Sequence, residues 1–224
     1  MTTTITRQQD IVLKVIQDYL DNNRILDLDK VIPYIKSYFS KSGININDNG
    51  LKLIIRTLIE NRYIINGSKL SRNNILQNIN RKRVYTIIKQ KSGLNFNQIL
   101  TILDLSYHVV AWHVNVLVKF ECIKKVKIEK HNIYFHNNVP SSNYIILHLL
   151  NKKKVKKIIS YLRENEDDGI TKSSASNNLK MNYQVISKYI DQLENSGILK
   201  KETFSNKNLY YLSQKYYKSF SIQQ

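Results

Sequence analysis

An internal repeat constrains the fold of this chain more than any other feature. When the sequence is shifted by 76 positions, residues 94–136 align with residues 170–212 without a gap. Identical pairs include Leu103 with Leu179, Tyr107 with Tyr183, Leu117 with Leu193, and Tyr134 with Tyr210. Self-similarity at a fixed offset indicates a structural unit that occurs more than once, so we expect two copies of a module of about 60 residues.

The earlier copy predicts three helices followed by two strands. Apolar residues at helical spacing end at Ser92-Gly93, a typical stop signal. Asn97 is the expected cap of a second, short helix, and Ser106 is the expected cap of a third helix with an apolar inner face. Two apolar segments, 123–128 and 132–135, predict a β-hairpin.

The later copy predicts the same order of elements. Helices are expected over 155–162, 172–179 and 182–194, followed by a hairpin that turns at residues 205–208. Three short helices and a two-stranded ribbon make a winged helix-turn-helix, in which the third helix projects from the surface as the element that reads DNA.

The first 70 residues predict a related unit that fits the same plan less closely, with a longer link between its second and third helices. Amphipathic helices are expected around 11–19 and 28–39, with Pro33 tolerated only in the first turn of its helix. Asn47 is the expected cap of a third helix, and residues 64–70 predict a short hairpin on an Asn-Gly turn.

These patterns together define an expected fold class and domain plan. The class is mostly α with small β-hairpin wings (α+β), in three tandem winged helix-turn-helix modules. The modules are expected at 1–72, which is only winged-helix-like, and at 78–138 and 150–214.

The charge of the chain favours a polyanionic partner. Its 224 residues include 35 Lys and Arg against 17 Asp and Glu, a net charge of +18. Cationic surface attracts phosphates and releases their counterions. The surplus of Asn, Ile, Lys and Tyr is equally typical of an AT-rich genome, which would add lysine to a protein of any function.

Enzyme, metal and membrane functions find little support in the residues. Only six glycines are present and they form no phosphate-binding loop, and no nucleophile or paired-carboxylate motif stands out. The single cysteine, Cys122, excludes an internal disulfide framework, and His108 and His113 are five residues apart, which is unsuitable for a metal pair on one helix face. We expect a non-enzyme without cofactor or metal ion, without membrane contact, in the cytoplasm.

Several segments carry a family likeness, namely residues 80–85, 92–97, 103–106, 109–117, 120–125 and 181–199. They resemble archaeal winged helix-turn-helix transcriptional regulators related to the ArsR and MarR groups, which are often built as tandem winged helices. The resemblance covers about 80–212 and is most specific at Trp112-His113. It implies DNA binding and transcriptional regulation. Glu121 stands where the later copy has the turn residue Gly197, which puts the geometry of the earlier wing in question.

The outward face of each third helix supplies the candidates for base contact. Asn115 and Gln184 can donate and accept together, as adenine requires, and Lys188 suits a phosphate or guanine. The expected DNA-binding residues of the two helices are Tyr107, His108, Ala111, Asn115, Tyr183, Gln184, Ser187 and Lys188. The expected phosphate contacts of the wings are Lys124, Lys125, Lys127, Lys130, Lys200, Lys201 and Lys207.

Three further features invite an interpretation. His113 follows the inner face of its helix and is expected to be partly buried with its hydrogen bonds satisfied. Trp112 is expected to pack against the wing or a neighbouring module. The lysine-rich segment 152–157 is either a solvated helix start or a phosphate contact.

A non-catalytic scaffold is the alternative function. Tandem winged helices also serve as protein-binding modules in membrane-remodelling complexes and in accessory subunits of RNA polymerase. A scaffold would present an apolar patch where a DNA-binding module presents polar residues. The mixed outward residues Lys52, Arg56 and Glu60 make the first module a candidate surface for a protein partner or for a homodimer.

Overall fold

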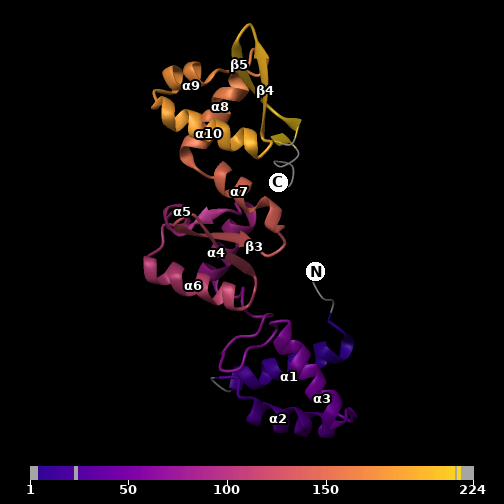
Figure 1. The fold of residues 1–224 in the computed structure, drawn as a ribbon. Coiled ribbons are helices and arrows are strands. Elements are labelled where there is room, and N and C mark those ends of the chain that lie inside the picture. Colours follow the sequence, from indigo (N-terminus) through magenta and orange to yellow (C-terminus); the bar gives the residue numbers. More distant parts are fainter. Residues whose placement is uncertain (1–4, 23–24, 215, 218–224) are drawn as a thin grey trace. The chain divides into compact units, whose positions relative to one another are not determined.

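The computed structural model describes residues 5–22, 25–214 and 216–217. The described chain is mostly helical with small antiparallel sheets, as expected for the α+β class (Figure 1). It divides into two compact units. The first lies within 1–86, 99–124 and 136–138, and the second lies within 87–98, 125–135 and 139–224.

Three helices open the first unit: α1 (Arg7–Asn22), α2 (Leu28–Lys41) and α3 (Asp48–Glu60). Apolar residues recur every three or four positions on each helix, and α1 therefore packs against both α2 and α3. Val12 and Leu13 of α1 and Ile35 of α2 are fully buried in this core.

The N-terminal turns of α2 and α3 show one prediction confirmed and one wrong. Asn47 caps α3 as expected, because its side-chain oxygen accepts a hydrogen bond from the Gly50 N–H at 2.7 Å. Pro33 lies in the second turn of α2, not the first. A proline there leaves the carbonyl of Asp29 without its helical donor, and the exposed position of Pro33 allows water to replace that donor.

The hairpin expected over 64–70 is reduced to a single antiparallel bridge between Ile64 and Ser71. The backbone in between pairs elsewhere. The Leu26 N–H donates to the Ser68 carbonyl, and the Gly67 N–H donates to the Leu26 carbonyl, both at 2.8 Å. The segment before α2 therefore takes the hydrogen bonds that a second strand would have used.

The middle of the chain has the element order of a winged helix-turn-helix: α4 (Ile79–Gln90), β1 (Leu94–Asn95), α5 (Phe96–Leu103), α6 (Tyr107–Lys119), β2 (Ile123–Ile128) and β3 (His131–His136). The sheet order is β1-β3-β2, and α5 and α6 meet at 118°, which is typical of a helix-turn-helix.

Two caps in this region differ from expectation. Asn95, not Asn97, caps α5: its side chain accepts from the Gln98 N–H, and the Gln98 side chain accepts from the Asn95 N–H. This reciprocal pair satisfies two free donors of the helix end, which a cap at Asn97 would not do. Ser106 stands at the cap position of α6 but makes no capping hydrogen bond with its side chain.

A short connection, η1 (Ser141–Asn143) and α7 (Tyr144–Leu150), follows β3 in the second unit. Gly93 lies so close to α7 that a Cβ atom there would stand 2.7 Å from the carbonyl carbon of Leu147, and its φ of +98° also requires glycine. The side chain of Asn151 donates to the Ser92 carbonyl at 2.8 Å, and this contact holds the same junction.

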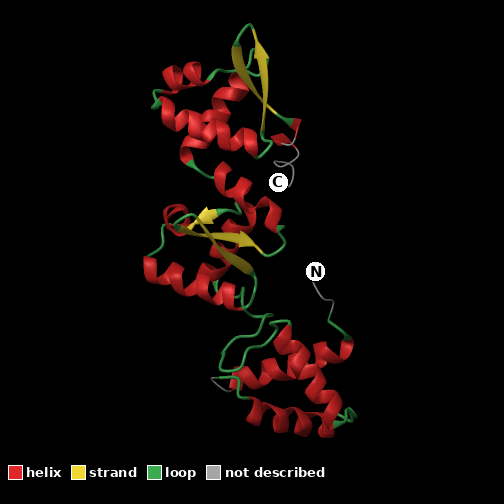
Figure 2. Cartoon of the chain, viewed as in Figure 1, coloured by secondary structure: helices red, strands yellow, loops and turns green. Residues whose placement is uncertain are grey.

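The remaining elements form what we call the C-terminal module: α8 (Lys153–Glu164), α9 (Lys172–Leu179), α10 (Tyr183–Asn195), β4 (Leu199–Phe204) and β5 (Lys207–Leu212) (Figure 2). The helix bounds and the hairpin agree closely with those expected from the repeat. β4 and β5 pair antiparallel from Leu199–Leu212 to Phe204–Lys207, and Ile170 adds a bridge to Tyr210.

The ends of α3, α6 and α10 share one backbone arrangement. In each, a residue with positive φ follows the helix, and the next N–H donates back to a buried leucine carbonyl at 2.8–2.9 Å, as in a Schellman motif. The positive-φ residues are Arg62 (57°), Glu121 (53°) and Gly197 (73°), and the leucines are Leu58, Leu117 and Leu193. Glu121 thus adopts the conformation of the glycine it replaces, and a hairpin follows in both places.

Among the described residues, no single helix has the length and apolar character needed to cross a membrane. Only the sharply bent pair of α5 and α6, taken together, meets that length and composition.

Candidate nucleic-acid interface

The outward face of α10 is polar. Ile186, Ile190 and Leu193 are fully buried in the core of the C-terminal module, as their spacing predicts. The same spacing turns the opposite face outward, so that Tyr183, Gln184 and Lys188 are exposed. Asn182 fixes the start of this face, because its side-chain oxygen accepts from the Gln184 N–H at 2.8 Å.

Ser187, which was expected on this face, is half-buried and engaged. Lys172 Nζ at the start of α9 donates to Ser187 Oγ at 3.0 Å, and Ser187 Oγ donates to Asp191 Oδ2 at 3.2 Å. Lys172 also forms an ion pair with Asp191. Burial lowers the pKa of Lys172, but the hydrogen bond to Asp191 and the nearby Tyr210 outweigh burial, and the net pKa is raised. This network joins α9 to α10 and occupies the Ser187 hydroxyl.

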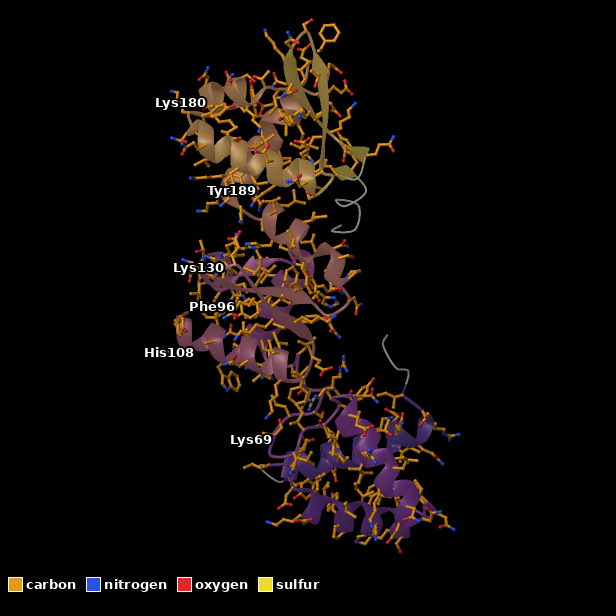
Figure 3. All side chains as sticks on the ribbon, viewed as in Figure 1. Lys69, Phe96, His108, Lys130, Lys180 and Tyr189 are labelled. Atoms are coloured by element: carbon orange, nitrogen blue, oxygen red, sulfur yellow. The ribbon has the colours of Figure 1, made fainter. Side chains whose placement is uncertain are left out.

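The C-terminal hairpin, β4 and β5, carries the expected wing lysines on its surface. Lys200, Lys201 and Lys207 are all exposed, and side chains project from the length of the ribbon (Figure 3). Lys200 is partnered: its Nζ lies 2.9 Å from a Glu202 carboxylate oxygen and 5.0 Å from the centre of the Tyr211 ring. The side chains of Lys201 and Lys207 make no ion pair or hydrogen bond with any described residue.

The outward face of α6 lies in the first unit. Tyr107, His108 and Asn115 are exposed and Ala111 is half-buried, whereas Val110, Val114 and Leu117 are buried. His108 stands near the start of the helix, where Figure 3 labels it. The faces predicted for α6 and α10 are therefore both found, with Ala111 and Ser187 as their half-buried members.

One expectation for α6 was wrong, and the environment of Trp112 beside it is also defined. His113 is 4% exposed, and its Nδ1 has no hydrogen-bond partner among the described residues, so it is not satisfied. Burial, together with the charge of Arg81, lowers the pKa of His113. Trp112 is 55% exposed, and the Arg81 guanidinium lies 5.5 Å from the centre of its ring. Arg81 is itself buried. The indole therefore lies against a buried cation of α4 and leaves about half of its surface exposed.

The middle hairpin, β2 and β3, has exposed lysines but an engaged tip. Lys124, Lys125, Lys127 and Lys130 are exposed, and Figure 3 labels Lys130 at the turn. Lys124 belongs to the first unit and the other three belong to the second. Beside the turn, Ile128 packs against the buried cluster of Ile133, Phe135 and Leu147, and Glu129 lies 3.8 Å from Lys152 Nζ.

The lysine-rich segment 152–157 opens α8. Lys152 is half-buried at the cap position without a capping bond, and Lys153, Lys154, Lys156 and Lys157 are exposed.

The sequence did not indicate Lys172 or Phe204. Phe204 is 73% exposed at the end of β4. Only the position of Phe204 beside the hairpin turn could have drawn attention to it.

Nothing in the described part of the chain gathers three or more His, Cys, Asp or Glu side chains in a way that could hold a metal ion. Cys122 is half-buried and burial raises its pKa, which keeps the thiol protonated.

No family model matches the chain. The sequence is 24% identical over 145 residues to an uncharacterized HTH-type transcriptional regulator of the archaeon Methanocaldococcus jannaschii. That alignment covers 65% of this chain and 36% of the relative, so the match spans about a third of the relative's length. A solved structure of the endosomal complex ESCRT-II aligns over the whole of both chains, with 15% identity and a TM-score of 0.23. At that score the similarity carries no argument.

Proposed function

We propose that this protein is a DNA-binding transcriptional regulator built from three tandem winged helix-turn-helix modules. One observation carries the proposal. In the C-terminal module, α10 and its hairpin present exposed polar and cationic side chains, of which Lys188, Lys201 and Lys207 have no partner among the described residues. Exposed cations without intramolecular partners are the electrostatic footprint of a phosphate-binding surface.

The proposed modules are 1–72, 78–138 and 150–214. The recurrence of one helix ending at the leucines Leu58, Leu117 and Leu193 supports this division, since each ending follows the third helix of its proposed module. The helix-turn-helix regulator named among the relatives supports a regulatory role for the matched part of the chain.

The proposed contacts follow from the shape and chemistry of a duplex. A helix fits the major groove, where the amide of Gln184 can donate to and accept from one adenine edge. Lys188 would contact a guanine or phosphate, and Lys201 and Lys207 of the wing would bind backbone phosphates without reading sequence. Tyr183 extends the same face at the first residue of α10.

The middle module is the proposed second reader. His108 and Asn115 of α6 are its proposed base contacts, and Tyr107 and Ala111 lie on the same helix face. Lys124, Lys125, Lys127 and Lys130 would bind phosphates there. All four are exposed, and their side chains make no ion pair with any described residue.

The alternative of a protein scaffold finds support at α6. Tyr107 and Trp112 are 61% and 55% exposed, which gives α6 more exposed apolar surface than α10. The length of DNA that the chain protects from nuclease distinguishes these roles for α6. If both the middle and the C-terminal modules bind DNA, two stretches of duplex are protected. If the middle module is a scaffold, only the stretch bound by the C-terminal module is protected. Lys52, Arg56 and Glu60 on α3 are exposed, and they are the proposed contacts of the first module with a protein partner or second copy.

The decisive experiment is selection of genomic DNA fragments by the purified full chain, followed by sequencing. Gln184→Ala combined with Lys188→Ala should broaden the selected sequences and weaken binding to the selected site by about 10-fold or more, because each good base contact contributes about 1–3 kcal/mol of discrimination. The matched control is Asp10→Ala with Lys14→Ala, an ion pair at 2.9 Å on α1 to which no contact is assigned. If the first double variant selects the same sequences with the same affinity as the wild type, α10 is not the reader.

A further inference from the structure

The tip of the C-terminal hairpin exposes a large apolar side chain that the fold does not use. Phe204 ends β4, pairs with Lys207 across the ladder, and is 73% exposed. Ser205 and Asn206 form the two-residue turn, with φ of 47° and 62°. Two positive φ values are typical of the tight type I′ turn, which holds the flanking residues in a fixed geometry. Phe204 is therefore presented on a defined ribbon and not on a loose loop.

The corresponding residue of the middle hairpin behaves differently. The offset of the repeat pairs Phe204 with Ile128, which also ends its strand. Ile128 is half-buried and packs against Ile133, Phe135 and Leu147. The same position is thus covered by the chain's own apolar cluster in one hairpin and left open in the other. β4 is exposed at every residue after Leu199, so the ribbon extends beyond the helices of its module (Figure 1).

The surroundings of Phe204 suit an anionic partner. Lys207 lies directly across the ladder and shares the face of Phe204, and its side chain makes no ion pair with any described residue. Glu202 also shares this face but is paired with Lys200 at 2.9 Å, and Lys201 projects from the opposite face of the ribbon. Behind the tip, the Thr203 hydroxyl donates to the side-chain oxygen of Asn208 at 2.9 Å and ties the strands together. An apolar protein partner would not require this unpaired lysine beside Phe204.

We propose that Phe204 is a wedge that enters the minor groove of duplex DNA and partly unstacks one base step. This inference rests on the proposed function. An apolar side chain on a firm support, flanked by lysine and an amide such as Asn206, is the combination with which proteins kink DNA from the minor groove. Flexible pyrimidine–purine steps are the easiest to open. The C-terminal wing then contributes to sequence preference as well as to phosphate binding.

The test uses the full chain and a 24-base-pair duplex with 2-aminopurine at central TA steps, a base whose fluorescence rises when it unstacks. Saturating wild-type protein should raise the fluorescence. Phe204→Ala should bind about 10-fold more weakly and give no rise at saturation, with an unchanged salt dependence because no charge is lost. Phe204→Leu should retain part of the rise. Leu53→Ala, which removes a 65% exposed apolar residue of α3, is the matched control and should behave as wild type.

Other outcomes separate this inference from the proposed function. If the wild type binds the duplex but Phe204→Ala gives the same affinity and fluorescence, the wedge is wrong and DNA binding stands. If the wild type binds no duplex, the proposed function itself fails. If Phe204→Ala changes only the mass measured by light scattering, Phe204 contacts a second copy of the chain and the wedge is again wrong. Thermal unfolding should not differ between the variants, because Phe204 contributes little buried area.

Discussion

Three lysines of the C-terminal module allow a quantitative test of phosphate binding. Lys188, Lys201 and Lys207 are exposed and make no ion pair with any described residue. Each lysine that neutralises a phosphate contributes about 0.9 to the slope of log K against log salt concentration. Replacing all three by alanine should therefore reduce the magnitude of the slope by about 2.7. The ratio of the wild-type affinity to the affinity of the triple variant should therefore fall about 40-fold when the salt concentration rises from 50 to 200 mM.

The assay is fluorescence anisotropy with a labelled duplex of mixed sequence, titrated at several KCl concentrations. A control of equal charge loss replaces three lysines of the first unit that each lie near a carboxylate. These are Lys14 with Asp10 at 2.9 Å, Lys30 with Asp27 at 3.6 Å, and Lys36 with Asp48 at 2.7 Å. The control should keep the wild-type slope. Equal slopes in the two triple variants would refute the reasoning, because binding would then follow net charge alone and not the proposed surface.

Two further predictions concern the fold. Gly93→Ala should destabilise the chain by about 3 kcal/mol or more in urea unfolding, because the new Cβ would collide with the Leu147 backbone at a positive φ. His113→Leu should stabilise the chain by about 1 kcal/mol at neutral pH, because it removes a buried nitrogen that has no hydrogen-bond partner among the described residues. Because burial lowers the folded-state pKa of His113, the wild type binds that proton only after unfolding, so its stability should fall as pH drops below about 6.5, and the substitution should flatten this loss.

Each of these predictions has a clear contrary result. Gly67 has a similar positive φ but nothing within 4 Å of an added Cβ, so Gly67→Ala is the control that separates the collision from the backbone strain. Equal losses at Gly93 and Gly67 would show that the contact with α7 contributes nothing. An unchanged pH profile in His113→Leu would show that His113 does not titrate on unfolding in this range. His148 is also buried with a lowered pKa, so part of the loss of stability at low pH should persist in this variant.

The helices were predictable because burial follows the helical period. The bounds expected for the second helix of the later copy, 172–179, are those of α9, and the third helix differs by one residue at each end. Local sequence rules predicted caps and turns less accurately, because more than one hydrogen-bonding arrangement was open to the backbone there. Asn95 and Asn97 are equally good capping residues by type, and only the reciprocal bond with Gln98 selects the former. The loop 64–70 lost its second strand because residue 26, far away in sequence, supplied the competing hydrogen bonds.

The candidate site shows the same limit in its side chains. Spacing alone correctly separated the buried and exposed faces of α10. It could not show that Lys172, from another helix, holds the Ser187 hydroxyl. Nor could it show that Arg81 is buried beneath Trp112, which leaves the indole at the surface. These outcomes depend on side-chain contacts between different helices, and the periodicity of a single segment does not reveal such contacts.

The common ending of α3, α6 and α10 bears on how such repeats can be traced. Arg62, Glu121 and Gly197 adopt a positive φ at corresponding positions, although a positive φ has a steric cost for arginine and glutamate that glycine does not have. What persists is the path of the chain out of the helix and back toward a leucine carbonyl, while the residue that follows this path is exchangeable. Related copies of a module could then be detected by comparing backbone torsion angles at the ends of helices, even at positions where the residue types no longer match.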